Sequence, residues 1–158
     1  MERLFAPWRM EYIRSSGPAD ECIFCAKPFE PDRRSNLILY CDDLTLVMLN
    51  RFPYNNGHIM VIPRKHVSSL SELEPAMFES LFRMLEKSIN ILKSAFNPDG
   101  FNVGMNMGRV AGAGIDQHLH IHVVPRWNGD TNFMPLLAET KVVSEHLLAT
   151  WDSLSGKF

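Results

Sequence analysis

The stretch at 118–125, HLHIHVVP, constrains the fold more than any other part of the chain, because histidines and apolar residues alternate along it. This alternation has the period of a β-strand, in which successive side chains point to opposite faces of a sheet. His118, His120 and His122 therefore share one face, and the apolar residues between them face a core. Neighbouring histidines lie roughly 6.6 Å apart along such a strand. The segment predicts a half-buried strand that presents a row of imidazoles.

Four other segments predict further strands. Short apolar, β-rich runs occupy 36–40, 44–50, 58–63 and 101–108. The first two runs are separated by Cys41-Asp42-Asp43, which predicts a tight hairpin. Glycine and proline in the intervening segments mark loops, of which RVAGAG (109–114) is the richest in glycine.

Two segments predict helices. Apolar residues recur every 3–4 positions after Pro75, which predicts a long helix that stops at 97–100, NPDG. Just upstream, Ser69 and Glu72 predict a capping box. A second helix is expected from about Lys141 to Leu154, with these inner positions: Val142, Leu147, Leu148 and Trp151. About five strands and two helices, without strict alternation, indicate an α+β fold with a mainly antiparallel sheet.

Length and charge narrow the class of protein. A chain of 158 residues can bury one real core, and we expect an N-terminal extension at 1–20 and a single domain at 21–158 that includes the C-terminal helix. The formal net charge of −2 argues against nucleic acid or a membrane as partner. No apolar run approaches the roughly 20 residues of a membrane span, and the charged N-terminus is not typical of a signal peptide. With three cysteines, two of them spaced as Cys-x-x-Cys, we expect a cytoplasmic protein.

A row of imidazoles is compatible with more than one chemistry. Such a row can hold a catalytic zinc ion with one open position for water. Alternatively, one ring can attack a phosphoryl group while its neighbours donate hydrogen bonds to the oxygens. Histidine suits the second task because its ordinary pKa, near 6.5, lets one ring stay neutral while another carries a proton. A polar outer face of a surface strand is the remaining interpretation.

The segment HLHIHVV fits the His-φ-His-φ-His-φ-φ signature of the histidine triad (HIT) superfamily, where φ is apolar. Three more segments resemble that family: LNRFPYNNGHIMVIPRKH, GMNMGRVAGAG and PRWNGDTNF, so that the resemblance covers roughly 20–135. APWRMEYI and NFMPLLAETKVVSEHL are most similar to bacterial proteins near the fragile-histidine-triad branch and the diadenosine tetraphosphate phosphorylases. The resemblance implies the HIT fold, a homodimer, and a nucleotide as small-molecule substrate.

The resemblance also implies roles for the histidines. His120 corresponds to the nucleophile that attacks the α-phosphorus and forms a nucleotidyl-histidine intermediate. His118 and His122 correspond to its flanking partners, which orient the ring, contact phosphate oxygens and help the leaving group depart. His58 matches an additional histidine that supports the triad. The implied activity is transfer of a nucleotidyl group from a dinucleoside polyphosphate to water or to orthophosphate, with Mg²⁺ accompanying the substrate as an option.

Other positions are candidates for substrate binding. By resemblance, Asn50 contacts ribose and Asn106 contacts phosphate or ribose. Gly112 and Gly114 let backbone N–H groups approach a phosphate, although they can also form a simple turn. Further phosphate donors would be these: Gln117, Arg109 and Arg126. Four apolar residues are expected either to line a base pocket or to belong to the core: Phe24, Leu37, Leu46 and Ile59. Trp127 is placed either to stack on a base or partner chain, or to pack internally.

The motif CIFC permits a redox pair or half of a structural zinc site. No thioredoxin-like βαβ pattern follows it, which disfavours the redox interpretation. Some bacterial HIT proteins bind zinc through two such cysteines, a histidine after a lysine and the first triad histidine. Carried over to this sequence, the zinc ligands are Cys22, Cys25, His66 and His118, whereas Cys41 is expected to pack. Two rival functions are a nucleotide-binding or signalling module with little turnover, and a hydrolase with all three triad histidines on a catalytic metal.

Overall fold

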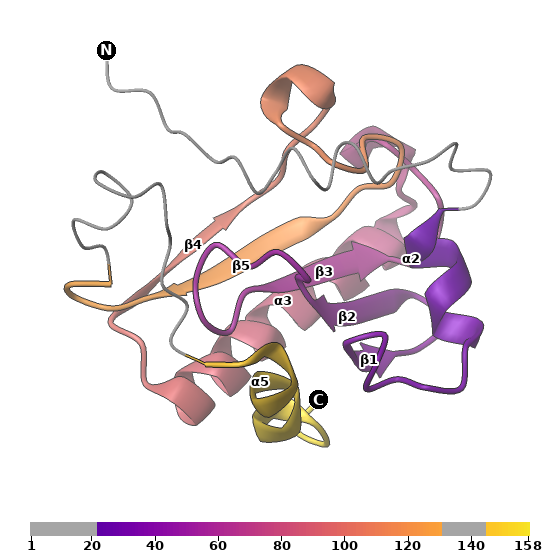
Figure 1. Cartoon of the computed structure of the whole chain (residues 1–158). Helices are drawn as coiled ribbons and strands as arrows, with labels where there is room; N and C mark the ends of the chain where they lie inside the picture. The colour runs from indigo at the N-terminus through magenta and orange to yellow at the C-terminus, as the bar shows by residue number, and fades with distance from the viewer. Residues whose placement is uncertain (1–21, 131–144) are drawn as a thin grey trace, which may run out of the picture.

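The computed structural model describes residues 22–130 and 145–158. Its centre is an open antiparallel sheet of five strands in the order β1-β2-β3-β5-β4 (Figure 1). The strands are β1 (Ile38–Cys41), β2 (Thr45–Leu49), β3 (Ile59–Pro63), β4 (Gly100–Gly104) and β5 (Ile121–Arg126). Every neighbouring pair is antiparallel, so the predicted α+β class with an antiparallel sheet is confirmed.

The alternation of side chains separates the two faces of the sheet. Val47 and Val61 pair across β2 and β3, and both belong to a core cluster that includes Leu81 of the long helix. Met48 and Met60 pair one position along and therefore point to the opposite face. There they pack with a smaller cluster that contains Phe24. The sheet thus has a helix-covered face and a second face on which the histidines lie.

The helix α3 (Pro75–Phe96) crosses the first face, behind the sheet in Figure 1. It begins with Pro75 at its first turn, as predicted, and ends because Asn97 adopts a left-handed conformation, with φ of 45°. Its buried residues recur every three to four positions, at Leu81, Met84, Ser88 and Leu92. The predicted long helix is therefore confirmed, and it ends directly before NPDG (97–100), as expected.

The second predicted helix is shorter in the described residues. The helix α5 (Leu147–Leu154) packs on the same core as α3, and Leu147, Leu148 and Trp151 contact that core as expected. Its first N–H groups are capped by His146, whose ring accepts a hydrogen bond from the N–H of Leu148. Val142 and the start expected near Lys141 lie outside the described residues, as does the 1–20 extension.

Short helical turns complete the fold. They are α2 (Ile23–Ala26), η1 (Lys27–Phe29), η2 (Leu70–Glu72) and η3 (Arg109–Ala111). Among the described residues, no helix has the length and apolar character to cross a membrane.

Several predicted boundaries were wrong by a few residues. Cys41 lies within β1, and the hairpin turn is made instead by the Asp42 carboxylate, which accepts hydrogen bonds from the N–H groups of Leu44 and Thr45. The strand predicted at 101–108 ends at Gly104. The expected capping box is also wrong, because Glu72 accepts from the N–H of Ser68 rather than from the following serine.

Candidate active site

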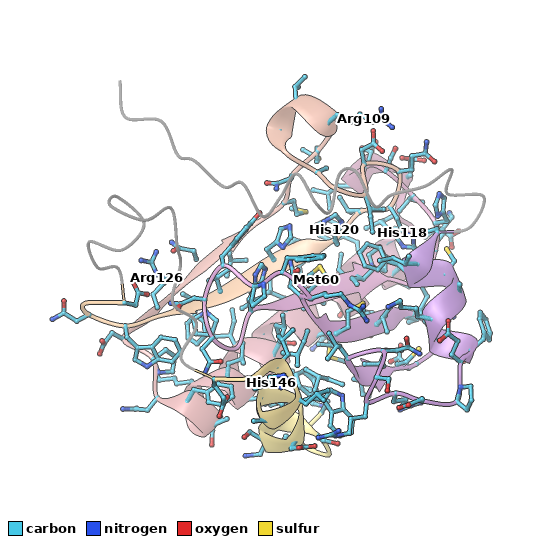
Figure 2. The ribbon with its side chains drawn as sticks, in the orientation of Figure 1. Met60, Arg109, His118, His120, Arg126 and His146 are labelled. Carbon is cyan, nitrogen blue, oxygen red and sulfur yellow. The ribbon has the colours of Figure 1, made fainter. Side chains whose placement is uncertain are left out.

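The three histidines of the triad lie at the start of β5, on the face of the sheet opposite α3. Paired strand begins only at Ile121, so His118 and His120 precede it in an extended segment whose Leu119 N–H donates to the carbonyl of Val67. Figure 2 shows His118 and His120 next to each other near α2. Both are buried, with exposures of 1% and 5%.

Both ring nitrogens of His118 contact other groups of the protein and do not face the open cavity. Its Nε2 lies 2.8 Å from the carbonyl oxygen of Pro63, and since that oxygen can only accept, Nε2 carries the proton. Nδ1 therefore keeps its lone pair, and it faces the sulfur atoms of Cys22 at 3.3 Å and Cys25 at 3.6 Å. Burial lowers the pKa of His118 to about 4. The predicted contact of this ring with phosphate oxygens does not fit this geometry, whereas the predicted metal-ligand role does.

His120 has the opposite tautomer. Its Nδ1 lies 2.8 Å from the carbonyl oxygen of His118 and must donate to it, which leaves the lone pair on Nε2. Burial lowers the pKa of His120, so the ring is neutral near pH 7. The ring of Phe24 packs against it, with centroids 5.3 Å apart. A neutral, oriented imidazole with its lone pair on Nε2 is what nucleophilic attack requires.

His58 and His122 form a hydrogen-bonded pair next to this ring. The backbone N–H of Tyr54 donates to Nδ1 of His58 at 3.0 Å, so the proton of the neutral His58 ring lies on Nε2. That Nε2 lies 3.0 Å from Nδ1 of His122 and donates to it. When both rings are neutral, this hydrogen bond leaves the proton of His122 on its Nε2. The backbone N–H of Tyr54 therefore sets the tautomer of His58, and His58 in turn sets the tautomer of His122, which faces the cavity.

A cavity of about 320 Å³ opens beside His120 and His122. Asn50, Gly112 and Gly114 line it, as the sequence predicts for substrate-binding residues. Among the proposed base-pocket residues, Phe24 and Leu37 line it, whereas Leu46 and Ile59 are buried in the core clusters. Its remaining walls are these: Ile23, Lys27, Asn36, Met48, Leu49, Arg51, Phe52, Tyr54, Met60 and Ile115. Mostly apolar walls with a few polar groups are typical of a small-molecule site.

The other predicted donors lie outside this cavity. Asn106 donates from Nδ2 to the carbonyl of Gly112 at 3.4 Å, so it supports the glycine loop. Gln117 lines a separate cavity beside His66. Arg109, which Figure 2 shows on the projecting η3 loop, is paired with Asp116.

Arg126 and Trp127 lie at the opposite end of β5. The Arg126 guanidinium pairs with Asp130 and donates to Asn102. The Trp127 N–H donates to the same Asp130 carboxylate. These contacts give Arg126 a structural role in the turn that follows β5, in place of the predicted phosphate contact.

Lys27 and Arg51, which line the cavity, were missed by the sequence analysis. Each is a single cation in an irregular segment, so no periodicity or motif distinguishes it from a solvated surface residue. The tertiary fold is needed to bring η1 and the loop after β2 to the same cavity.

The four residues Cys22, Cys25, His66 and His118 are brought together as the resemblance implied. Their ligand atoms all lie within 4.8 Å of one another, and Cys25 Sγ is 3.4 Å from His66 Nδ1. Tetrahedral bonds of about 2.3 Å to sulfur and 2.05 Å to nitrogen place those atoms about 3.6 Å apart. The observed separations and the unprotonated Nδ1 of His118 therefore fit a four-coordinate metal site.

Comparison with known proteins agrees with this arrangement. The model of the HIT domain family matches residues 33–129. The chain belongs to the HIT family. AP-4-A phosphorylase from Mycobacterium tuberculosis is 36% identical over 157 residues, which cover 95% of this chain and 80% of that relative. An asymmetrical bis(5'-nucleosyl)-tetraphosphatase from Schizosaccharomyces pombe is 30% identical over 93 residues, 59% of this chain and 50% of the relative. A zinc-bound histidine triad family protein from Mycobacterium smegmatis has a TM-score of 0.66 at 25% identity, covering 87% of this chain and 92% of its own.

Proposed function

We propose that this HIT protein is an enzyme that transfers a nucleotidyl group from a dinucleoside polyphosphate, of the diadenosine tetraphosphate or triphosphate class, through a covalent intermediate on His120. The observation that carries the proposal is the tautomer of His120, which leaves a neutral Nε2 lone pair at the wall of a nucleotide-sized cavity. Relatives named AP-4-A phosphorylase and bis(5'-nucleosyl)-tetraphosphatase support this substrate class.

The substrate would lie across the sheet. Its nucleoside fits the mostly apolar part of the cavity between Phe24 and Leu37, with Asn50 at the ribose. Its α-phosphate lies between His120 and the glycine loop, where Gly112 and Gly114 form the cavity wall. This orientation places the phosphorus next to the Nε2 lone pair, at the end of the cavity formed by β5.

The first step forms a bond between His120 Nε2 and the α-phosphorus and breaks the bond to the leaving oxygen, whose electron pair departs with the polyphosphate. With diadenosine tetraphosphate the leaving group is ATP, and the His122 Nε2–H donates to its oxygen. In the second step an acceptor oxygen attacks the phosphorus, and the P–N electron pair returns to Nε2. Two displacements at a pre-oriented imidazole replace one difficult displacement.

Both acceptors use the same first step, so the histidines do not choose between them. Water yields AMP, and orthophosphate yields ADP. We favour orthophosphate, because the relative that spans 95% of this chain is named a phosphorylase. The test is to incubate the protein with diadenosine tetraphosphate, with and without orthophosphate. ADP and ATP formed only with orthophosphate support a phosphorylase, AMP and ATP in both conditions support a hydrolase, and no product in either contradicts the proposal.

Neither rival function is favoured by the geometry. A catalytic metal on all three triad histidines would need their lone pairs to converge, but His118 directs Nδ1 at the cysteines. A binding module without turnover would not require the tautomers of His120 and His122 to be fixed by backbone groups. Among the described residues no group supports a resident Mg²⁺ site, so Mg²⁺ would enter only with the substrate.

We also propose that the four-residue cluster holds zinc with a structural role. Two thiolates and two imidazoles are a closed ligand set, and the zinc-bound structural relative supports the choice of metal. When bound, the ion supplies no chemistry to the reaction; it fixes the segment after Cys22 against the sheet. Thiolate ligands require a reducing environment, so we place the protein in the cytoplasm.

A homodimer is the assembly that we propose. The strand β4 is an edge of the sheet, and Val103 on it is 46% exposed. Phe78 and Phe82 of α3 are also exposed, with ring centroids 4.7 Å apart. A second copy that pairs along β4 would cover an edge that soluble proteins otherwise protect. Light scattering of the Val103→Lys variant tests this: a dimer that becomes a monomer supports the β4 interface, and an unchanged dimer contradicts it.

A further inference from the structure

Two cations line the same cavity as His120 and His122. Lys27 belongs to η1 and lies in the wall together with Asn36 and Leu37, just before β1. Arg51 directly follows Asn50, at the end of β2. Neither side chain takes part in an ion pair within 22–130 and 145–158. A mostly apolar pocket therefore contains two basic groups that the triad mechanism does not use.

The two cations are close enough to repel each other. Burial lowers the pKa of Lys27, and the charge of Arg51 lowers it further. Glu30 acts in the opposite sense, but its carboxylate is already engaged by Asn36 Nδ2 at 2.6 Å. The local balance of these three side chains is one net positive charge. An anion bound between Lys27 and Arg51 would offset the electrostatic repulsion between these two side chains.

The order of strands shows which part of a ligand these cations would meet. The α-phosphate is placed at His120, just before β5, and β2 lies two strand spacings away, or about 9.6 Å. The segment before β1 lies one spacing further. Arg51 is thus on the β2 side of the cavity, where the proposed orientation places the nucleoside, and Lys27 lines the same cavity. The polyphosphate chain begins at the other end of the cavity, beside His122.

We propose that Lys27 and Arg51 form a subsite for a second anionic group on the nucleoside, a phosphate monoester on the 2′ or 3′ hydroxyl of the ribose. This inference rests on the proposed function for the orientation of the nucleotide, and it adds nucleotides phosphorylated on the ribose to the ligands that the site accepts. An arginine fork and a lysine ammonium are the donors that bind a phosphate dianion most strongly. Asn50, which the resemblance places at the ribose hydroxyls, precedes Arg51 directly.

The test is equilibrium binding of four ligands to the purified full-length protein by calorimetry. AMP reports on the nucleotide site itself. Adenosine 2′,5′-bisphosphate and adenosine 3′,5′-bisphosphate add a phosphate to the ribose, and their comparison identifies the hydroxyl. ADP adds a phosphate to the 5′ chain and controls for charge alone. We expect at least one bisphosphate to bind about tenfold more tightly than AMP, equivalent to ~1.4 kcal/mol, and ADP to gain clearly less.

Variants assign the gain to the two side chains. Lys27→Met and Arg51→Leu should each remove most of the gain from the ribose phosphate, measured as the ratio of bisphosphate affinity to AMP affinity within the same variant. Lys93→Met removes one exposed cation from α3, on the other side of the sheet, and should retain the full gain. Retained AMP affinity also shows that each variant is folded.

The outcomes separate this inference from the proposed function. If AMP binds but neither bisphosphate binds more tightly, the subsite is refuted and the nucleotide site stands. If ADP gains as much as the bisphosphates and loses the gain in Lys27→Met, the cations serve the polyphosphate chain and the inference is wrong. If Lys93→Met loses as much of the gain in affinity as Lys27→Met does, the gain comes from the overall charge of the protein and the subsite is refuted. If AMP itself does not bind, the proposed function fails together with the inference.

Discussion

The substitution His58→Phe tests the relay that sets the tautomer of His122. His58 is only 1% exposed, and phenylalanine keeps a planar aromatic ring of slightly larger size there while removing the two hydrogen bonds of the imidazole nitrogens. One of these comes from the N–H of Tyr54, and the other goes to Nδ1 of His122. The change should therefore act on hydrogen bonding and leave the packing of the core largely intact.

Two effects of different size follow. The N–H of Tyr54, a half-buried residue, loses its acceptor on His58, which should lower the free energy of unfolding by ~0.5–1.5 kcal/mol. His122 loses the donor that holds its proton on Nε2, so it no longer delivers a proton reliably to the leaving group. General acid catalysis contributes about 10²–10⁴-fold, and since His122 remains present, we expect kcat to fall by about 10²-fold, the lower limit.

The assay compares two leaving groups. The phosphoramidate of AMP releases an amine that must receive a proton from His122 to leave, whereas the p-nitrophenyl ester of AMP releases a stable phenolate that does not. The loss in His58→Phe should be large with the first substrate and small with the second. His122→Phe should show the same contrast, and the double variant should lose little more than either single one, because both act through one proton. His146→Phe is the matched control, because it likewise removes a hydrogen bond between a histidine ring and a backbone N–H, at the N-cap of α5 and outside the site. Equal losses with both substrates would refute the relay and reduce His58 to a packing residue.

The site leads to four further predictions. His120→Ala should abolish turnover while calorimetry still detects AMP binding; a variant that keeps most of its kcat would exclude the covalent mechanism. Burial lowers the pKa of His120 below its usual 6.5, so the acidic limb of the kcat/KM profile assigned to this ring should lie below pH 6.5, and a limb above that value would contradict its neutral state. In metal-free protein the unfolded chain binds a proton at His118 before the folded chain does, so stability should fall as the pH drops from 6.5 towards about 4; stability unchanged over that window would contradict the lowered pKa. Protein purified after zinc-replete growth should contain one zinc per chain by elemental analysis, and Cys25→Ser should lower both the zinc content and Tm; wild-type protein with no stoichiometric metal would remove the zinc proposal.

Much of the fold follows from local pattern. The alternation around His120 correctly assigns Ile121 and Val123 to the core face of the sheet and the histidines to the cavity face, because a one-residue shift in register would exchange the two sets. The apolar spacing after Pro75 identifies α3 for a similar reason. Strand ends were less accurate, since Asp42 forms its turn through side-chain hydrogen bonds that the apolar pattern does not reveal.

The site was predictable in its members but not in their geometry. The histidine row and the family resemblance identified the residues, yet they treated His118 and His122 as similar partners of His120. The structure distinguishes them through groups that are remote in sequence: the carbonyl of Pro63 acts on His118, and the N–H of Tyr54 acts on His122 through His58. Backbone atoms carry no sequence signature, so no motif could have revealed these tautomers.

Because the histidines have different contacts, a metal at the proposed four-residue site would influence the proposed reaction without touching the substrate. His118 engages both ring nitrogens elsewhere, and its link to the nucleophile is its backbone carbonyl, which accepts from His120 Nδ1. Phe24, located between Cys22 and Cys25, packs on both rings and also lines the cavity. A metal that holds those cysteines against His118 would therefore fix one wall of the nucleotide cavity and the orientation of the attacking ring together. Loss of the metal should accordingly weaken nucleotide binding as well as turnover, whereas loss of the His122 proton should slow only the chemical step.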